Sequence, residues 1–159
     1  MRSLGFFRSC TLDQQQPPPP DVVAADEVIS AYVRNKKQVY AETGAVKHEV
    51  LMPRRFNGRL ETSICRTVGL GSAQFWKLCE EHYDSKAPTP AVGHGVGVAS
   101  AVTVEGLSFD VDRDPHPWHA NIIGWPDPAD VPIDERKHFS MSVAQKIAKK
   151  FKFQPRPQA

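Results

Sequence analysis

Proline and glycine interrupt this sequence so often that every helix or strand must be short. Proline lacks the N–H that helix and sheet interiors use, and glycine favours turns. The breaks fall at Pro53, Asn57-Gly58, Pro88 with Pro90, residues 93–97, Gly106, Pro115 with Pro117, and Pro126. Between them, apolar residues recur at both strand and helix spacing. The sequence therefore predicts a small α+β domain, with about four strands in one mixed or antiparallel sheet and two to three helices.

The N-terminal part of the chain is predicted to lie outside this domain. Residues 11–21 contain four consecutive prolines and show no periodicity, which suits an extended, polyproline-like tether. Such a tether would fit an SH3-like groove, although an extension without a role is the stronger expectation. We expect a disordered extension over residues 1–25, a single domain over residues 26–153 and a disordered tail over residues 154–159.

Several segments between the breaks have the alternation or the short apolar run of a strand. The predicted strands are residues 46–52, 60–67, 107–111 and 120–125. The first two are expected to pair as a hairpin around Arg54 to Arg59, because Asn57-Gly58 is a strong turn signal. Residues 26–40 fit either a helix or a strand, since their apolar residues are β-branched or aromatic yet nearly helical in spacing.

Two segments have the one-sided apolar pattern of an amphipathic helix. The first follows Ser72, a good N-cap, and extends to Tyr83. The second covers residues 143–151 and carries lysines near its partially negative C-terminal end. A short third helix is expected over residues 98–105, and the glycines of residues 93–97 are expected to form a loose connection.

Composition and cysteine content argue against several classes of protein. No apolar run reaches the roughly 18 residues that a membrane span requires, and the N-terminus is charged too early for a signal peptide. Cys10, Cys65 and Cys79 form no CxxC pair, so neither a disulfide framework nor a zinc ribbon is indicated. Residues 93–97 lack the lysine of a phosphate loop. We expect a cytoplasmic protein that enters no membrane and holds no cofactor.

The net charge of +2 hides an uneven distribution of charged residues. Residues 34–59 carry seven basic and two acidic side chains, residues 80–135 carry two basic and eleven acidic ones, and residues 136–159 carry seven basic and no acidic ones. This distribution would allow a basic surface for nucleic acid. The simpler interpretation, that the charges keep two surface elements in solution, is the stronger one.

Several short motifs follow one another in a distinctive order. They are Ser63, Arg66, Thr67, Gly69 and Leu70; a helix with Trp76; Gly106, Leu107 and Asp112; and the run His-Ala-Asn-Ile-Ile-Gly-Trp-Pro over residues 119–126. This order resembles a pattern in a family of short bacterial proteins with no assigned activity. The resemblance covers most of residues 46–150, implies a complete single domain of bacterial origin, and directs attention to Arg66 and His119.

The densest polar cluster combines acidic residues on a strand with histidines in the loop that follows. It contains Asp110, Asp112, Asp114, His116 and His119. Carboxylate oxygens suit magnesium or manganese and imidazole suits zinc, so Asp114, His116 and His119 are weak candidates for metal ligands. A calcium loop is excluded because a proline stands where that loop needs glycine. The favoured interpretation is a solvated strand face with turn histidines and no metal.

A second candidate site places an arginine beside histidines on adjacent strands. Arg66 would hold a phosphate or carboxylate, while His119 would transfer a proton with help from Asp112 and a metal. His48, on the preceding strand, would face the same side. The alternative is a structural arginine that pairs with Asp112 or Glu61, which is the commoner role of arginine in a sheet.

The leading hypothesis from the sequence is a small accessory protein that binds an unknown protein partner. Trp118 lies in a proline-bounded loop and is expected to be exposed, as an anchor for such a partner. Lys146, Lys149 and Lys150 form a basic surface on the C-terminal helix that would contact the same partner.

Two other hypotheses involve phosphate-bearing ligands. The first is a small hydrolase or phosphotransfer enzyme that acts on a nucleotide or nucleic acid through the arginine and histidine described above. The second is direct binding of DNA or RNA by Arg54, Arg55 and Arg59 together with the C-terminal lysines. The relative positions of these side chains decide between the hypotheses.

Overall fold

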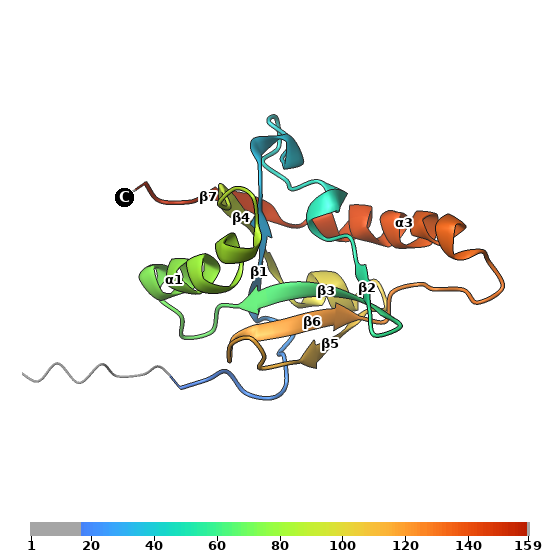
Figure 1. Cartoon of the computed structure of the whole chain (residues 1–159), viewed down its shortest axis with the longest axis horizontal. Coiled ribbons are helices and arrows are strands. Elements are labelled where there is room, and N and C mark those ends of the chain that lie inside the picture. Colours follow the sequence, from blue (N-terminus) through green and yellow to red (C-terminus); the bar gives the residue numbers. More distant parts are fainter. Residues whose placement is uncertain (1–16, 159) are drawn as a thin grey trace, which may run out of the picture.

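An antiparallel sheet forms the centre of the computed structural model, which describes residues 17–158 (Figure 1). Its strands are β1 Val28–Val33, β2 Arg54–Phe56, β3 Arg59–Arg66, β4 Gly93–Val98, β5 Ser108–Val111, β6 His119–Ile123 and β7 Lys152–Pro155. Six of them follow the order β5-β6-β3-β1-β4-β7, and β2 pairs with β3. β3 pairs with β1, β2 and β6, so it connects the two halves of the sheet.

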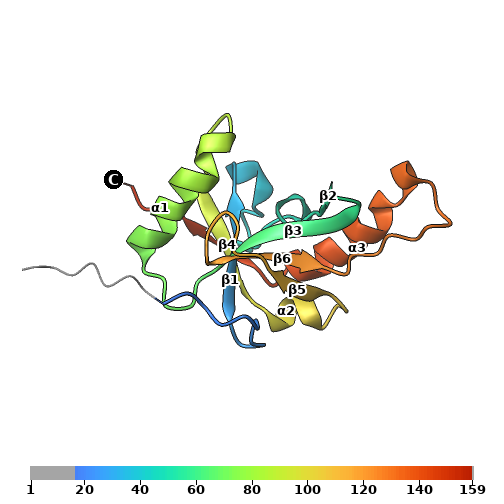
Figure 2. The same ribbon diagram turned by 60° about the horizontal axis from the view of Figure 1, so that its bottom comes forward.

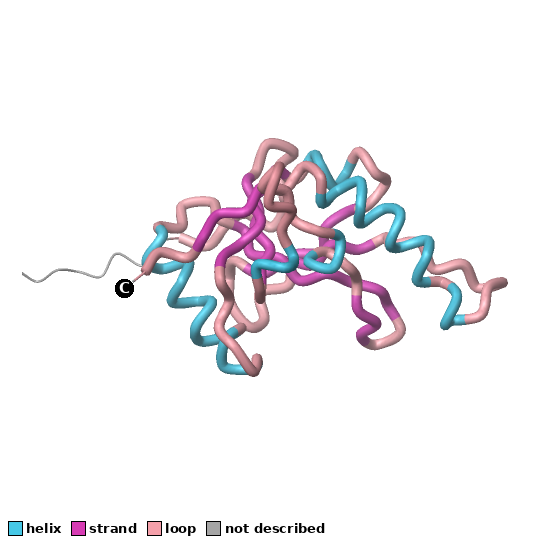
Figure 3. The backbone as a smooth tube through the Cα atoms, turned by 90° about the horizontal axis from the view of Figure 1, so that it is seen from above, coloured by secondary structure: helices cyan, strands magenta, loops and turns pink. Residues whose placement is uncertain are grey.

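Helices cover both faces of this sheet. They are α1 Ser72–His82, α2 Ser100–Thr103 and α3 Lys137–Ala148, with 3-10 turns η1 Lys36–Gln38, η2 His48–Val50, η3 Asp84–Lys86 and η4 Ile133–Glu135. α2 and α3 belong to the main core on one face, while α1 forms a second core on the other. The main core includes Ile29, Val33, Val46, Leu51, Ile64, Val102, Ile147 and Phe151, and the second core includes Cys65, Phe75, Trp76, Leu78, Cys79 and Trp118. Figure 2 shows α1 and α2 on opposite sides of the strands, and Figure 3 shows α1 and α3 at opposite ends of the molecule. None of the described helices is long and apolar enough to cross a membrane.

The single α+β domain agrees with the sequence prediction, but the predicted number of about four strands is wrong, since the described residues form seven. β1 lies in the segment whose pattern fits either a helix or a strand. β4 lies in the glycines that predict a loose connection. β7 extends past residue 153, the predicted end of the domain, because it adds a partner to the edge of β4.

The basic hairpin forms, but its first strand begins later than the sequence predicts. Asn57 and Gly58 have φ angles of 49° and 76°, the two positive values that suit a tight two-residue turn. The predicted strand over residues 46–52 is absent, because the chain forms η2 there instead. This turn lets Val46 and Leu51 both reach the main core, which an extended segment at the sheet edge would not allow.

Glycines in β4 allow phenylalanine rings to approach the sheet closely. Gly93, Gly95 and Gly97 pair with core residues of β1 and therefore point to the core face. A Cβ atom on Gly97 would lie 2.6 Å from the Phe151 ring, and one on Gly93 would collide with the Phe153 ring. The alternating glycines are thus a strand pattern matched to the two phenylalanines that follow α3.

Gly97→Ala should lower the free energy of unfolding by about 1–3 kcal/mol, because the added methyl group must displace the Phe151 ring from the core. Gly71→Ala is the matched control, since its Cβ meets no atom within 4 Å, and its effect should stay within about 0.5 kcal/mol. Urea unfolding followed by circular dichroism measures both variants. Equal losses in the two proteins would contradict the packing explanation.

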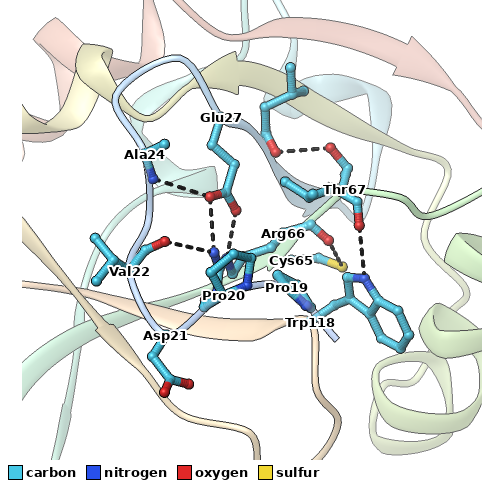
Figure 4. A network of polar contacts seen from close by, with 12 residues as sticks. Pro19, Pro20, Asp21, Val22, Ala24, Glu27, Cys65, Arg66, Thr67 and Trp118 are labelled. Atoms are coloured by element: carbon cyan, nitrogen blue, oxygen red, sulfur yellow. Dashed lines mark hydrogen bonds and ion pairs between the residues drawn. The ribbon is translucent and has the colours of Figure 1, made fainter. Parts of the chain in front are cut away.

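A buried ion pair joins the N-terminal segment to the sheet (Figure 4). The Arg66 side chain is fully buried, and its Nε and Nη2 atoms donate to the Glu27 carboxylate at 2.5 and 2.9 Å. The same guanidinium donates to the carbonyl oxygens of Pro20 and Val22 at 2.5 and 3.2 Å. Contacts with the sheet therefore include residues before residue 26, the predicted start of the domain.

Arg66→Met should lower the free energy of unfolding by about 3–5 kcal/mol, because Glu27 would stay buried without its partner. The double variant Arg66→Met with Glu27→Leu should recover much of that loss, since it removes both buried charges. Differential scanning calorimetry of the wild type and both variants measures this. A double variant no more stable than the single one would show that the arginine matters through packing alone.

Candidate functional site

A cleft of about 620 Å³ opens on the face of the sheet opposite the main core. One wall is the C-terminal half of α1 with η3, another is the β2–β3 hairpin, and the third is the loop that leads into β6. Ser30, Ser63 and Cys65 are among the strand residues that form its floor. The cleft brings together polar side chains that are far apart in the sequence, so it is the candidate functional site.

The alternation of β3 separates this cleft from the core. Ile64 belongs to the main core, whereas its neighbours Ser63 and Cys65 point to the other face. The register of β3 with β6 places Asn121 opposite Ser63 and His119 opposite Cys65. The Ser63 hydroxyl donates to the Asn121 side-chain oxygen at 3.3 Å. His119 therefore reaches the cleft because of its position in the strand.

Histidines line one edge of the cleft. His82 ends α1, His116 lies in the loop before β6, and His119 begins β6. The ring centroids of His82 and His116 are 5.2 Å apart, and those of His116 and His119 are 6.1 Å apart. The histidine loop of the polar cluster identified in the sequence thus contributes two of these rings. The third comes from a helix that only the fold brings beside it.

The hydrogen bond of His119 fixes the position of its proton. Its Nδ1 lies 2.8 Å from the carbonyl oxygen of Asp112. A carbonyl oxygen only accepts, so Nδ1 carries the hydrogen and Nε2 of the neutral ring has a lone pair. The ring is partly exposed and lines the cleft. His119 is therefore suited to accept a proton or a hydrogen bond from a ligand.

His116 has the opposite proton arrangement. The backbone N–H of Trp118 donates to Nδ1 of His116 at 3.2 Å, so Nε2 of the neutral ring carries the hydrogen. Burial is the main reason that the pKa of His116 falls to about 4, and the charges of His82 and His119 lower it further. His116 is neutral at pH 7 and separates two histidines that are more accessible.

Unpaired positive charge exceeds unpaired negative charge at the cleft. Arg34, Arg54 and Lys86 line it, and none of them forms an ion pair within residues 17–158. The acidic residues of the lining are Glu49 and Glu61. Glu61 is occupied by an arginine of its own strand at 2.7 Å. The cleft is consequently suited to an anionic ligand.

The three hairpin arginines predicted to bind nucleic acid differ in their surroundings. Arg55 forms two hydrogen bonds with the Asp127 carboxylate, at 2.8 and 2.9 Å, and this contact is the main reason that the pKa of Asp127 falls to about 2. Arg59 binds Asp110 at 2.9 Å as well as a carboxylate in its own strand. Arg54 has no such partner in the described part of the chain, which leaves it available to a ligand.

Aromatic rings support the α1 wall of the cleft. The ring centroid of Tyr32 lies 4.9 Å from that of Tyr83 and 5.2 Å from that of Phe75. The Tyr32 hydroxyl is buried without a hydrogen-bond partner among the described residues, and burial raises its pKa. Burial also raises the pKa of Cys65 to about 12. Neither group is ionised at pH 7, so neither is an activated nucleophile.

The structure does not bring the predicted catalytic residues together. Arg66 lies opposite the core residue Ile29 in the register, while His119 points to the cleft on the other face. Asp112 is exposed and contributes its backbone carbonyl, rather than its carboxylate, to His119. Arg66 forms its ion pair with Glu27, rather than with Asp112 or Glu61 as the sequence suggested.

The candidate metal ligands do not form a cluster. Among residues 17–158, no group of three or more His, Cys, Asp or Glu side chains is arranged to hold a metal ion. Asp114 is exposed, and its backbone N–H donates to Asp112 at 3.0 Å in a local turn. His48 lies in η2, 3.8 Å from Glu49, and does not line the cleft.

The expected exposure of Trp118 is wrong, because only 7% of this residue is exposed. Its ring belongs to the second core, and its Nε1 donates to the carbonyl oxygen of Val68 at 3.2 Å. Lys146, Lys149 and Lys150 are exposed at the end of α3, the helix that packs on the opposite face of the sheet. The tryptophan and the lysines therefore do not form one surface.

Sequence reasoning missed several residues of the cleft, namely Arg34, His82, Tyr83 and Lys86. Arg34 lies in the segment whose pattern fits either a helix or a strand, and the other three lie at or just after the end of α1, a helix whose orientation no local pattern specifies. The available signal was the group of polar and aromatic residues at the C-terminus of α1. These residues line the cleft because the fold places the end of α1 and η3 opposite the β2–β3 hairpin, and this placement cannot be read from the local sequence.

Comparisons with models of protein families, with curated proteins and with solved structures found no match to this chain. The resemblance to short bacterial proteins therefore gains no support from them.

Stability should fall as the pH is lowered from about 7 to about 4. Burial lowers the pKa of both His94 and His116 to about 4, whereas an unfolded histidine has a pKa of about 6.5. In this window the unfolded chain binds more protons, which favours unfolding. His94→Gln should shrink the difference in melting temperature between pH 7 and pH 5, while the exposed control His138→Gln should not. An unchanged difference in His94→Gln would show that His94 does not contribute.

Proposed function

We propose that the cleft binds a single-stranded segment of nucleic acid. The supporting observation is that Arg34, Arg54 and Lys86 surround a cleft at which Phe56 presents an exposed ring. Proteins that bind single strands combine a positively charged groove for the backbone with aromatic side chains on which bases stack. Both features occur here within one site.

The hairpin supplies one cation and one aromatic ring from the same side of a strand. Arg54 and Phe56 flank Arg55, whose side chain turns away and binds a carboxylate. Phe56 is 61% exposed, so a base can stack on its ring while Arg54 contacts a phosphate of the same strand. The paired hairpin arginines contribute less to binding in this proposal, and Arg34 and Lys86 of the opposite wall take their place.

The opposite wall offers a second cation and ring pair. The Arg34 guanidinium lies over the Tyr83 ring at 5.0 Å, and Lys86 follows in η3. Stacking on a ring keeps the edge of a guanidinium free to donate to a phosphate. The cleft volume of about 620 Å³ lies within the range of about 300–1,000 Å³ that is usual for pockets of small ligands. It therefore suits a short unpaired segment better than a duplex.

Binding of a protein partner stays a prediction, with weaker support. The burial of Trp118 removes the aromatic anchor of that hypothesis. The other residues predicted to contact a protein partner are the exposed lysines at the end of α3, and they lie away from the cleft. One of these lysines also provides a control for the experiment below.

Arg54→Ala and Lys86→Ala should each weaken the binding of a short fluorescent oligonucleotide. Each should also reduce the slope of log affinity against log salt concentration by about 0.7, because one phosphate contact is lost. Phe56→Ala should weaken binding by about 1–3 kcal/mol without changing that slope, because it removes stacking rather than charge. Fluorescence anisotropy over a salt series measures all three variants.

Lys149→Ala is the matched control, since it removes an exposed positive charge from the C-cap of α3. It should leave both the affinity and the salt slope close to those of the wild type. The proposal is wrong if the wild-type protein shows no salt-dependent binding. It is also wrong if Lys149→Ala weakens binding as much as Arg54→Ala, because the charge would then act without the cleft.

A further inference from the structure

We propose that the histidine edge of the cleft cleaves RNA, with His119 as the general base and His82 as the general acid. This inference rests on the proposed binding of a nucleic acid strand in the same cleft. The observation behind it is the row of three imidazoles beside the unpaired cations. Imidazole is the side chain best suited to both proton transfers near neutral pH.

His119 has the features of a base. Its Nδ1–H is held by the Asp112 carbonyl oxygen at 2.8 Å, which fixes the ring orientation and leaves Nε2 to accept a proton. The carbonyl dipole also stabilises the imidazolium that forms when Nε2 is protonated. A histidine held in this way acts through a defined atom, as general base catalysis requires.

His82 has the features of an acid. It stands at the C-terminal end of α1, where the helix dipole favours a positive charge. Its Nε2 lies 3.8 Å from a carboxylate oxygen of Glu81, which forms an ion pair with the protonated ring. Its side chain is 29% exposed, so a leaving oxygen can reach it.

His116 separates these two rings and acts as a positioning residue. Its contacts with both rings, at centroid distances of 5.2 and 6.1 Å, hold them apart at the cleft edge. The attacking and leaving oxygens of a phosphoryl transfer lie in line on opposite sides of phosphorus. An acid and a base therefore have to act from different sides of the phosphate, and His82 and His119 take these two places in the proposed mechanism.

The reaction balances without a further reactant. The 2′-hydroxyl of the ribose gives its proton to Nε2 of His119, and the 2′ oxygen forms a bond to phosphorus. The bond between phosphorus and the 5′ oxygen breaks, and that oxygen takes a proton from His82. The products are a 2′,3′-cyclic phosphate and a 5′-hydroxyl end. Water then opens the cyclic phosphate as the two histidines exchange roles, and both return to their starting protonation states.

The cations of the cleft complete the site. Charge accumulates on the two non-bridging phosphate oxygens in the transition state, and positioned cations stabilise it. Arg54 and Lys86 have no carboxylate partner in the described part of the chain, so they can serve these oxygens. A DNA strand offers the same phosphates but lacks the 2′-hydroxyl. It should bind and remain intact.

The test uses the purified full chain with an end-labelled RNA oligonucleotide and a DNA oligonucleotide of matched sequence. Cleavage is followed by gel electrophoresis, with and without a metal chelator, and binding is measured by anisotropy. The wild type should cleave RNA in the presence of the chelator, form cyclic phosphate ends that are later opened to 3′-phosphates, and bind DNA without cleaving it. Cleavage of DNA, or cleavage abolished by the chelator, would overturn the mechanism.

His119→Asn is the informative variant, because the asparagine amide can still donate to the Asp112 carbonyl while the basic nitrogen is lost. Its cleavage rate should fall by a factor of about 10²–10⁴, and its affinity for DNA should stay within about twofold of the wild type, as expected for a group that acts in the chemical step rather than in binding. His82→Asn should behave similarly. His138→Asn, on α3, should cleave at the wild-type rate.

The outcomes separate the two proposals. A protein that binds both oligonucleotides but cleaves neither overturns the catalytic inference and leaves the proposed binding function standing. A protein that binds neither overturns both. Cleavage that persists unchanged in His119→Asn also overturns the inference, because it would then come from another site or from a contaminant. Thermal melting of each variant shows whether a loss of cleavage reflects unfolding.

Discussion

The rest of the structure depends on the buried contact between Arg66 and Glu27. The arginine side chain fastens the segment that enters β1, while its own backbone N–H donates to the carbonyl oxygen of Trp118 at 2.7 Å. One residue thus contacts both the N-terminal segment and the loop that contains His116 and leads to His119 of β6. A buried ion pair of this kind is expensive to break because the remaining charge cannot reach water. The ion pair therefore fixes the segment that enters β1 on the face of the sheet opposite the cleft.

Local patterns predicted the elements whose partners lie close in the sequence. The helix α1 and the turn at Asn57-Gly58 are both found, because amphipathic spacing and positive φ angles are local properties. The predicted N-cap is wrong, since Gly71 occupies that position, Ser72 is the first helical residue, and no side chain caps the helix. The sequence does not predict β4, because the reason for its glycines is the close packing of the Phe151 ring, and Phe151 lies far along the chain. Its alternating glycines have the composition of a loop and become a strand pattern only when large rings cover them.

Local sequence patterns predict even less of the candidate site than of the fold. His119 was recognised from the sequence, yet the assigned partner Arg66 points to the other face, because a strand places consecutive residues on opposite sides. His82 was missed because the direction of α1 across the sheet is decided by the packing of Phe75 against Tyr32 and His94. Ring packing of this kind is a tertiary property, and no spacing within the helix contains it.

The alternation of β3 has a consequence for how this chain can change in evolution. Ile64 faces the core and Cys65 faces the cleft, so inserting or deleting one residue within β3 would exchange the two faces from that point onward. The same change in the Asn57-Gly58 turn would alter only the tip of the hairpin. Length variation among descendants of this protein should therefore collect in the turn, where it changes the reach of Phe56 and with it the width of the cleft mouth.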